Sequence, residues 1–144
     1  MYKHILLPID GSDASTRAVD KGAELAKVLG ATVTLMTAIE QHPMALAGSV
    51  YRAADNPMHQ AARDAGAFWL EQARQVVAKH GIEAKLLTVE ERSVTQAILD
   101  AAQTAGADLI VMGSHGAGAI ERLLLGSQTQ RVLAHTAIPV LVLR

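Results

Sequence analysis

The feature that most constrains the fold of this chain is an alternation between short apolar runs and longer helical patterns. Small and apolar residues recur at spacings of three and four over residues 14–29, 62–77 and 94–105, as amphipathic helices require. The apolar runs between them are nearly continuous rather than alternating, which is typical of parallel strands covered on both faces. The runs are Ile5–Ile9, Val33–Ile39, Ala84–Val89, Leu109–Met112 and Val140–Leu143.

Glycine and hydroxyl residues mark the expected ends and starts of the helices. Ser93 with Gln96, and Ser127 with Gln130, fit a capping box, in which a hydroxyl and an amide satisfy unpaired N–H groups of the first turn. We therefore expect a fourth helix to begin at Ser127. Glycine closes a helix in the left-handed conformation at no steric cost, and three glycines follow the helical patterns: Gly30, Gly81 and Gly106.

Strands that alternate with helices in this way predict an α/β fold. We expect a five-stranded, parallel, doubly wound sheet of order 3-2-1-4-5 with helices on both faces, in one domain that spans residues 1–144. In that order the last run lies at an edge of the sheet.

Composition excludes several classes of function. The net charge of −1 offers no basic field for nucleic acid, and the absence of cysteine excludes disulfides and thiolate sites. No apolar run approaches the roughly 18 residues needed to span a bilayer, so no membrane partner is expected. The cytoplasm is the expected location.

One segment lacks a regular period. It runs from Glu40 to about Gln60 and contains Pro43, Gly48 and Pro57. A connection of this length in a compact domain is usually either functional or disordered. Two interpretations remain open: a tolerated surface insertion, or a lid or partner-binding loop on the ligand side of the sheet.

Two loops are expected to carry the chemistry. In open α/β sheets, ligands bind beyond the carboxyl ends of the strands, where the strand order reverses. In the order 3-2-1-4-5 that point lies between the first and fourth runs, so residues 8–12 would face residues 112–116. Gly126 then opens a helix whose first N–H groups and dipole favour an anion, and Asp10 is suited to ribose hydroxyls or a metal ion. A ribose with phosphates is the ligand that satisfies both loops.

Simpler interpretations exist for each of these residues. Gly113 and Gly126 are also suited to plain turns, and Asp10 to the N-terminus of the first helix alone. Ser127 is suited to an N-cap and His115 to a solvent-facing loop. The histidines show no ligand spacing for zinc, and no nucleophile-elbow or P-loop motif is present.

The spacing of these glycines resembles a known signature. Gly113-x2-Gly116-x9-Gly126-Ser127 is similar to the nucleotide-binding motif of the universal stress protein family, in its ATP-binding branch. The resemblance extends along the whole chain, through residues 5–12, 107–114 and 138–142. It implies the fold described above, bound ATP with Mg²⁺ as a candidate partner, and a homodimer. The edge strand Val140–Leu143 is a natural template for pairing with a second copy.

The resemblance also assigns roles to individual residues. Asp10 would contact the ribose or a metal ion, and the backbone at Ala38, where the family often has the larger valine, would face adenine. His115 and Gly116 would lie over the triphosphate, although Ala117 stands where family members often carry a basic residue. The nucleotide-binding set is Pro8, Ile9, Asp10, Ala38, Met112, Gly113, His115, Gly116, Gly126, Ser127, Gln128 and Thr129.

The sequence and the resemblance leave three hypotheses for the function of this protein. The first is an ATP-binding regulatory or stress-response protein with little or no hydrolysis, since no catalytic set accompanies the glycine signature. The second is a slow ATPase or nucleotidyl-transfer enzyme that uses the same site. The third is a ligand-independent interaction protein that acts through the segment 40–60.

Overall fold

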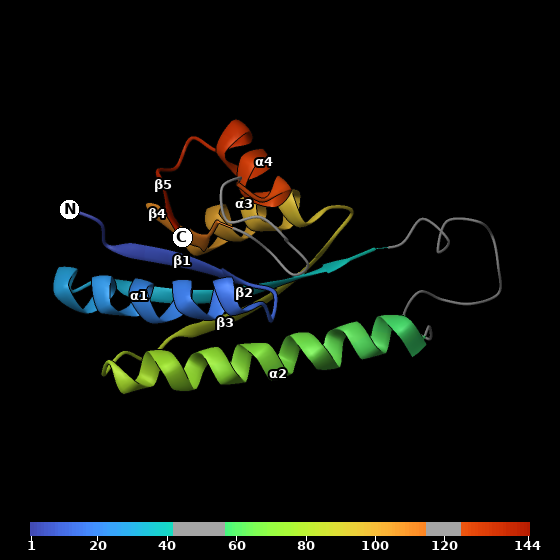
Figure 1. The fold of residues 1–144 in the computed structure, drawn as a ribbon, viewed down its shortest axis with the longest axis horizontal. Helices are drawn as coiled ribbons and strands as arrows, with labels where there is room; N and C mark the ends of the chain where they lie inside the picture. The colour runs from blue at the N-terminus through green and yellow to red at the C-terminus, as the bar shows by residue number, and fades with distance from the viewer. Residues whose placement is uncertain (42–56, 115–124) are drawn as a thin grey trace.

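The predicted alternation of strands and helices is present in the computed structural model, which describes residues 1–41, 57–114 and 125–144 (Figure 1). The elements are β1 (His4–Ile9), α1 (Asp13–Leu29), β2 (Thr32–Glu40), α2 (Pro57–Lys79), β3 (Lys85–Glu91), α3 (Val94–Ala105), β4 (Leu109–Gly113), α4 (Ser127–His135) and β5 (Val140–Leu143).

The five strands form one sheet of order β3-β2-β1-β4-β5, and every neighbouring pair is parallel. The predicted order 3-2-1-4-5 is therefore confirmed. In the register of the sheet, Ile9 pairs with Thr37 and Gly113 pairs with Leu143. The carboxyl ends of the central strands consequently meet at one edge of the sheet.

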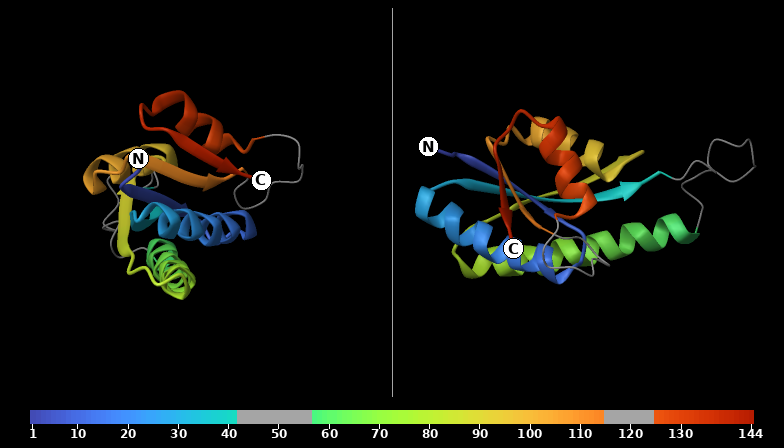
Figure 2. Two further views of the ribbon diagram at one scale, coloured as in Figure 1. Left: turned by 90° about the vertical axis from the view of Figure 1, so that its left-hand side faces the viewer. Right: turned by 45° about the horizontal axis from the view of Figure 1, so that its top comes forward.

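Helices cover both faces of the sheet, as predicted (Figure 2). Residues of α1 and α2 pack on one face against alternate residues of β1 such as Ile5 and Leu7. Residues of α3 and α4 pack on the other face, against Leu6 of β1 and Ile110 of β4. The strand alternation thus divides the core into two apolar layers.

Glycine and serine set the helix ends at most of the expected places. Gly30 and Gly106 are left-handed C-caps, with φ of 66° in both. Ser93 is the N-cap of α3, and its hydroxyl accepts the N–H of Gln96. Each cap satisfies backbone groups that a helix end leaves unpaired.

Helix α4 begins at Ser127 as predicted, but the predicted serine cap is wrong, and α2 begins earlier than its helical pattern indicated. Ser127 is the first residue of α4 rather than its cap: Gly126 takes the N-cap position, with no side-chain cap, and the Gln130 amide donates to the Leu125 carbonyl. Helix α2 begins at Pro57, inside the segment expected to be irregular, because proline at a first helical position lacks only an N–H that has no partner there anyway. Glu40 ends β2, and residues 42–56 lie outside the described ranges.

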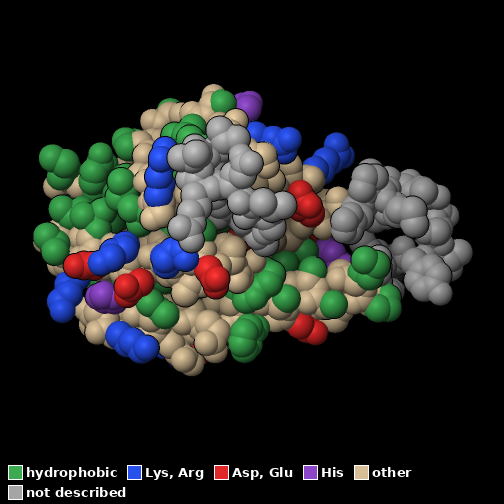
Figure 3. All heavy atoms as spheres, viewed as in Figure 1, with side chains coloured by type: hydrophobic (Ala, Val, Ile, Leu, Met, Phe, Trp, Pro, Cys, Tyr) green, Lys and Arg blue, Asp and Glu red, His purple; other side chains and the backbone are tan. Residues whose placement is uncertain are grey.

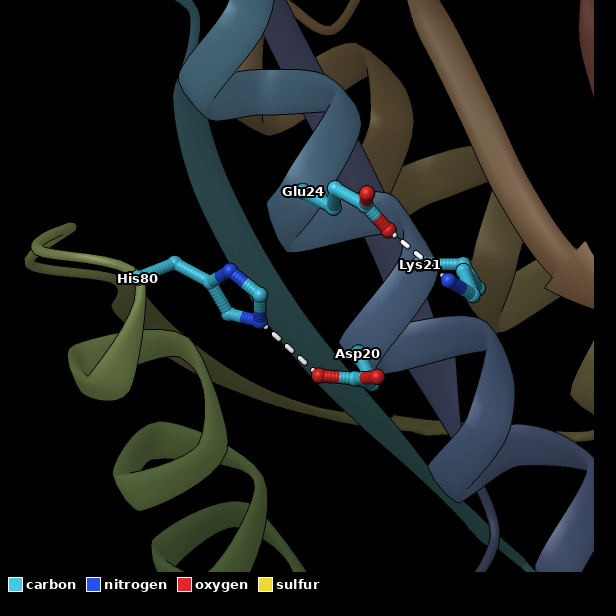
Figure 4. A network of polar contacts seen from close by, with 4 residues as sticks. All are labelled: Asp20, Lys21, Glu24 and His80. Carbon is cyan, nitrogen blue, oxygen red and sulfur yellow. Dashed lines mark hydrogen bonds and ion pairs between the residues drawn. The ribbon is translucent and has the colours of Figure 1, made fainter.

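Side-chain contacts connect α2 to its neighbours at both ends. Near its start, Arg63 Nε donates to Glu90 Oε1 of β3 over 2.6 Å, and this hydrogen bond is the main cause that lowers the pKa of Glu90. Just beyond its end, His80 Nε2 lies 2.8 Å from Asp20 Oδ1 of α1 (Figure 4). Figure 3 shows positive, negative and apolar side chains mixed over this α1–α2 face.

Candidate functional site

A pocket opens at the carboxyl ends of β1, β2 and β4, in the region where the sequence predicts a ligand site. Its empty space, open solvent included, is about 480 Å³. The predicted residues on its wall are Pro8, Ile9, Asp10, Ala38, Met112, Gly113, Gln128 and Thr129. The wall also contains four residues that were not predicted: Ser15, Met36, Val94 and Ile98.

The missed residues supply most of the apolar wall. Met36 lies two residues before Ala38 on β2, so both side chains point to the same face of the sheet. Val94 and Ile98 are four residues apart on α3 and therefore share one face of that helix. These spacings were available in the sequence, but they are equally typical of core positions. The resulting wall suits a flat apolar ring.

The loop after β1 presents Asp10 to the pocket in a defined turn. Asp10 Oδ1 accepts the Ser12 N–H over 3.0 Å, which is an Asx turn. Ser12 is the N-cap of α1 and accepts the Ser15 N–H through its hydroxyl, and the Ser15 hydroxyl donates back to the Ser12 carbonyl. Gly11 joins these residues with φ of 79°. Among the described residues that line the pocket, Asp10 is the ionisable one.

The end of β4 and the start of α4 form the opposite side. Gly126 donates its N–H to the Ser114 carbonyl over 2.6 Å, and the Thr129 hydroxyl donates to the Gly113 carbonyl over 3.0 Å. The Thr129 side chain is buried, and its hydroxyl proton and the Gly126 N–H already have acceptors within the protein. By the geometry of any α-helix, N–H groups of the first turn of α4 have no acceptor within the helix. Those groups, rather than the Thr129 hydroxyl proton, are suited to an anion.

Gly113 has a packing role as well as a place on the wall. A Cβ on Gly113 would lie 2.9 Å from the backbone carbonyl carbon and oxygen of Ala14. Only glycine lets β4 approach the first turn of α1 this closely. This glycine was predicted to make room for a ligand, and its Cα also lies against a neighbour within the protein, Ala14.

The remaining predicted residues fall in two groups. Gln128 lies on the wall and accepts a hydrogen bond from the Thr95 hydroxyl of α3 over 2.9 Å. Ser127 is exposed beside it and, like Gly126, is not part of the wall. His115 and Gly116 lie outside the described residues, as does Ala117.

Among the described residues, the carboxylate of Asp10 is not part of a metal cluster. Within residues 1–41, 57–114 and 125–144, no three His, Cys, Asp or Glu side chains are grouped so that they could hold a metal ion. Asp10 by itself offers one carboxylate, which would need oxygen ligands from a phosphate to complete a Mg²⁺ site. The pocket combines an apolar wall, the carboxylate of Asp10 and the first turn of α4.

Comparisons with known proteins agree with the fold. The family model described as "Universal stress protein family" matches residues 1–144. A universal stress protein of Thermus aquaticus, encoded in the 3' region of a QAH/OAS sulfhydrylase, is 35% identical over 144 residues, which cover 100% of both chains.

Two solved structures are similar over nearly the whole chain. The hypothetical protein MJ0577 has a TM-score of 0.83 and 26% identity, over 99% of this chain and 96% of its own. A universal stress protein in complex with cAMP has a TM-score of 0.75 and 27% identity, over 99% and 97%. Among the described helices, none is both long and apolar enough to cross a membrane. The full-length family match and the 35% identical relative establish that this chain belongs to the universal stress protein family.

Proposed function

We propose that this protein binds ATP in the pocket at the ends of β1 and β4 and acts as a regulatory or stress-response module. The proposal depends on one observation: an apolar wall, the Asp10 carboxylate and the first turn of α4 lie together in one pocket. These match a base, a ribose and a phosphate chain respectively. The structural neighbour in complex with cAMP supports an adenine nucleotide.

The proposed orientation follows from the wall. The adenine packs between Met36, Ala38 and Ile98, where the lining is apolar. The ribose lies toward Asp10 and Met112, and a carboxylate is a good acceptor for two vicinal hydroxyls. The phosphates extend toward Gly126, Ser127, Gln128 and Thr129, and Asp10 would be the residue that holds a Mg²⁺ ion bound with them. The resemblance to the family assigns His115 and Gly116, which lie outside the described residues, to the triphosphate as well.

We also propose that turnover of the bound ATP is slow. Phosphoryl transfer needs a positioned base or water-orienting group and positive charge near the γ-phosphate. The described wall residues provide Asp10 and Gln128, but Gln128 is held by Thr95 and no lysine or arginine belongs to that wall. The pocket is therefore built to hold a nucleotide more than to hydrolyse it.

Calorimetric titration with ATP-Mg²⁺, AMP and cAMP tests the proposal. Asp10→Asn keeps an oxygen for the Ser12 N–H and removes the charge, so it should weaken ATP binding about tenfold, the loss of a hydrogen bond to a charged group. Asp13→Asn makes the same charge change on an exposed residue of the first turn of α1 and is the matched control.

Filling the base end of the pocket gives a second variant. Ala38→Leu places extra atoms on the apolar wall and should abolish binding, whereas Ala78→Leu makes the same change on an exposed position of α2 and should leave it intact. A wild-type chain that binds none of the three nucleotides would refute the proposal. Steady ADP release that disappears in Asp10→Asn would instead establish an ATPase.

We further propose a homodimer formed through the C-terminal edge strand. β5 pairs with β4 and with no other strand among the described residues, and Leu141 is 39% exposed on it. An apolar edge of this kind is a template for a second copy. Leu141→Lys should convert a dimer to a monomer in analytical sedimentation, whereas Val28→Lys on the exposed side of α1 should not. A wild-type chain that sediments as a monomer at micromolar concentration would overturn this assignment.

A further inference from the structure

The only tryptophan of the chain packs on the loop that carries Asp10. A Cβ built on Gly11 would lie 2.3 Å from Cε2 of Trp69 and 2.4 Å from its Nε1. The indole therefore occupies the space that a side chain at position 11 would need. Figure 1 shows this loop, between β1 and α1, beside the middle of α2, the helix that carries Trp69.

The other side of the same loop is held by the sheet. Gly113, at the end of β4, lies so close to Ala14 that a Cβ would come within 2.9 Å of its backbone. Residues 10–15 are thus enclosed between Trp69 of α2 and the end of β4. Neither Gly11 nor Gly113 leaves space for one further carbon atom, so the loop is closely packed against both neighbours.

The enclosed loop supplies two residues of the pocket wall. Asp10 precedes Gly11 directly, and its carboxylate is tied across Gly11 to the Ser12 N–H. Ser15, 7% exposed, also lines the pocket and is tied to Ser12 by two hydrogen bonds. A shift of Gly11 toward α2 would therefore carry the Asp10 carboxylate with it.

We propose that Trp69 is a positioning residue for the nucleotide site: its packing on Gly11 holds Asp10 and Ser15 in their places on the pocket wall. Trp69 itself is not among the wall residues, so it acts through the loop and not through the ligand. The inference rests on the proposed nucleotide binding and adds to it a physical connection between the pocket and α2. Because coupling free energies are reciprocal, a Trp69 contact that strengthens binding is itself strengthened when the pocket is occupied, and the indole is expected to report this.

The test compares Trp69→Leu and Trp69→Phe with Phe68→Leu, a change of an adjacent aromatic residue that is 62% exposed on the same helix. Kd for ATP-Mg²⁺ is measured by calorimetry at a temperature where thermal melts show all three variants folded. We expect Kd to rise about tenfold in Trp69→Leu, less in Trp69→Phe, and not at all in Phe68→Leu. Trp69→Phe retains an aromatic ring, so a folded variant remains if the leucine variant unfolds.

Two readouts separate positioning from a merely structural role. Tryptophan emission of the wild type, which comes from Trp69 alone, should shift on titration with ATP-Mg²⁺ and saturate with the calorimetric Kd. In the ligand-free Trp69→Leu variant, the amides of Ser12 and Ser15 should exchange hydrogen faster than in the wild type, with amides of α3 unchanged.

The outcomes are distinct. Wild-type binding with unchanged Kd in both Trp69 variants overturns the positioning role and leaves nucleotide binding intact. Lower melting temperatures with unchanged Kd and unchanged exchange at Ser12 and Ser15 also overturn it, because Trp69 would then stabilise the fold alone. A wild-type chain without nucleotide affinity overturns the proposed function and this inference together.

Discussion

Substitution of Gly11 by alanine should be much more destabilising than the same substitution at Gly81, although both glycines have φ of 79°. An L-residue in this left-handed conformation costs roughly 1–2 kcal/mol, and this cost is common to both positions. At Gly81 no atom lies within 4 Å of the added Cβ. At Gly11 the added Cβ falls on the Trp69 ring, 2.3 Å from Cε2, which forces the indole, the helix or the loop to move.

The difference between the two variants measures the clash. Overpacking of a well-packed contact costs about 1–3 kcal/mol, so Gly11→Ala should lower the free energy of unfolding by about 2–5 kcal/mol in total, and Gly81→Ala by about 1–2 kcal/mol. The entropy that alanine removes from the unfolded chain is the same in both and cancels. Urea denaturation at a fixed protein concentration gives both values if the m-values agree.

A double variant identifies Trp69 as the cause. Gly11→Ala with Trp69→Leu should be less destabilised than the sum of the single variants by about 1 kcal/mol or more, because the smaller side chain makes room for the methyl group. The φ cost at position 11 remains in the double variant. If Gly11→Ala and Gly81→Ala agree within about 0.5 kcal/mol, or if the two changes are additive, the proposed contact is not present in solution.

Two further predictions concern the helix starts and the pH dependence. Ser93→Ala removes the cap of α3 and should lower the free energy of unfolding by about 1 kcal/mol in a urea titration. Ser127→Ala, at a helix capped by Gly126, should change it by less than about 0.5 kcal/mol in the same assay. Burial, and then the charge of Lys85, lower the pKa of His4 below its ordinary value of 6.5, so the folded state resists protonation of a ring that lies against the Thr32 and Thr34 hydroxyls. The neutral His4 ring therefore adds to the free energy of unfolding above pH 6.5, and this stabilisation is lost as the pH falls toward the lowered pKa of the folded state. From about pH 8 to about pH 5, the free energy of unfolding of His4→Gln should consequently decline less than that of the wild type. An equal decline in both proteins would contradict the assignment to His4.

The fold could be predicted because its signals are local or follow from chain handedness. Near-continuous apolar runs indicated buried parallel strands, and the glycine stops at Gly30 and Gly106 are confirmed as left-handed caps. The right-handed crossover rule then left few strand orders to consider. Helix starts were less certain from sequence. The pattern at Ser127 fits a cap or a first residue equally well, and Pro57 is compatible with either a loop or a first helical turn.

Sequence could predict only those pocket residues that directly follow the strands whose ends meet at the pocket. Asp10 and Gly113 follow strands that the topology brings together, and both line the pocket. Met36 and Ile98 line it too, yet a buried methionine on a strand and an isoleucine on a helix have the same sequence pattern whether they face a ligand or the core. The distinction depends on the space left between α3 and β2, which no local pattern encodes.

The glycines of the site show why sequence spacing alone misjudges their roles. Gly113 was predicted to make room for a ligand, but its nearest constraint is the backbone of Ala14, so a larger residue there would displace α1 whether or not a nucleotide binds. Gly11 is likewise constrained by Trp69, far away in sequence. Loss of binding in a Gly113 variant would consequently not distinguish a lost ligand contact from a displaced loop. Asp10→Asn and Ala38→Leu, which change the wall without touching these close contacts, are the variants from which an affinity can be interpreted.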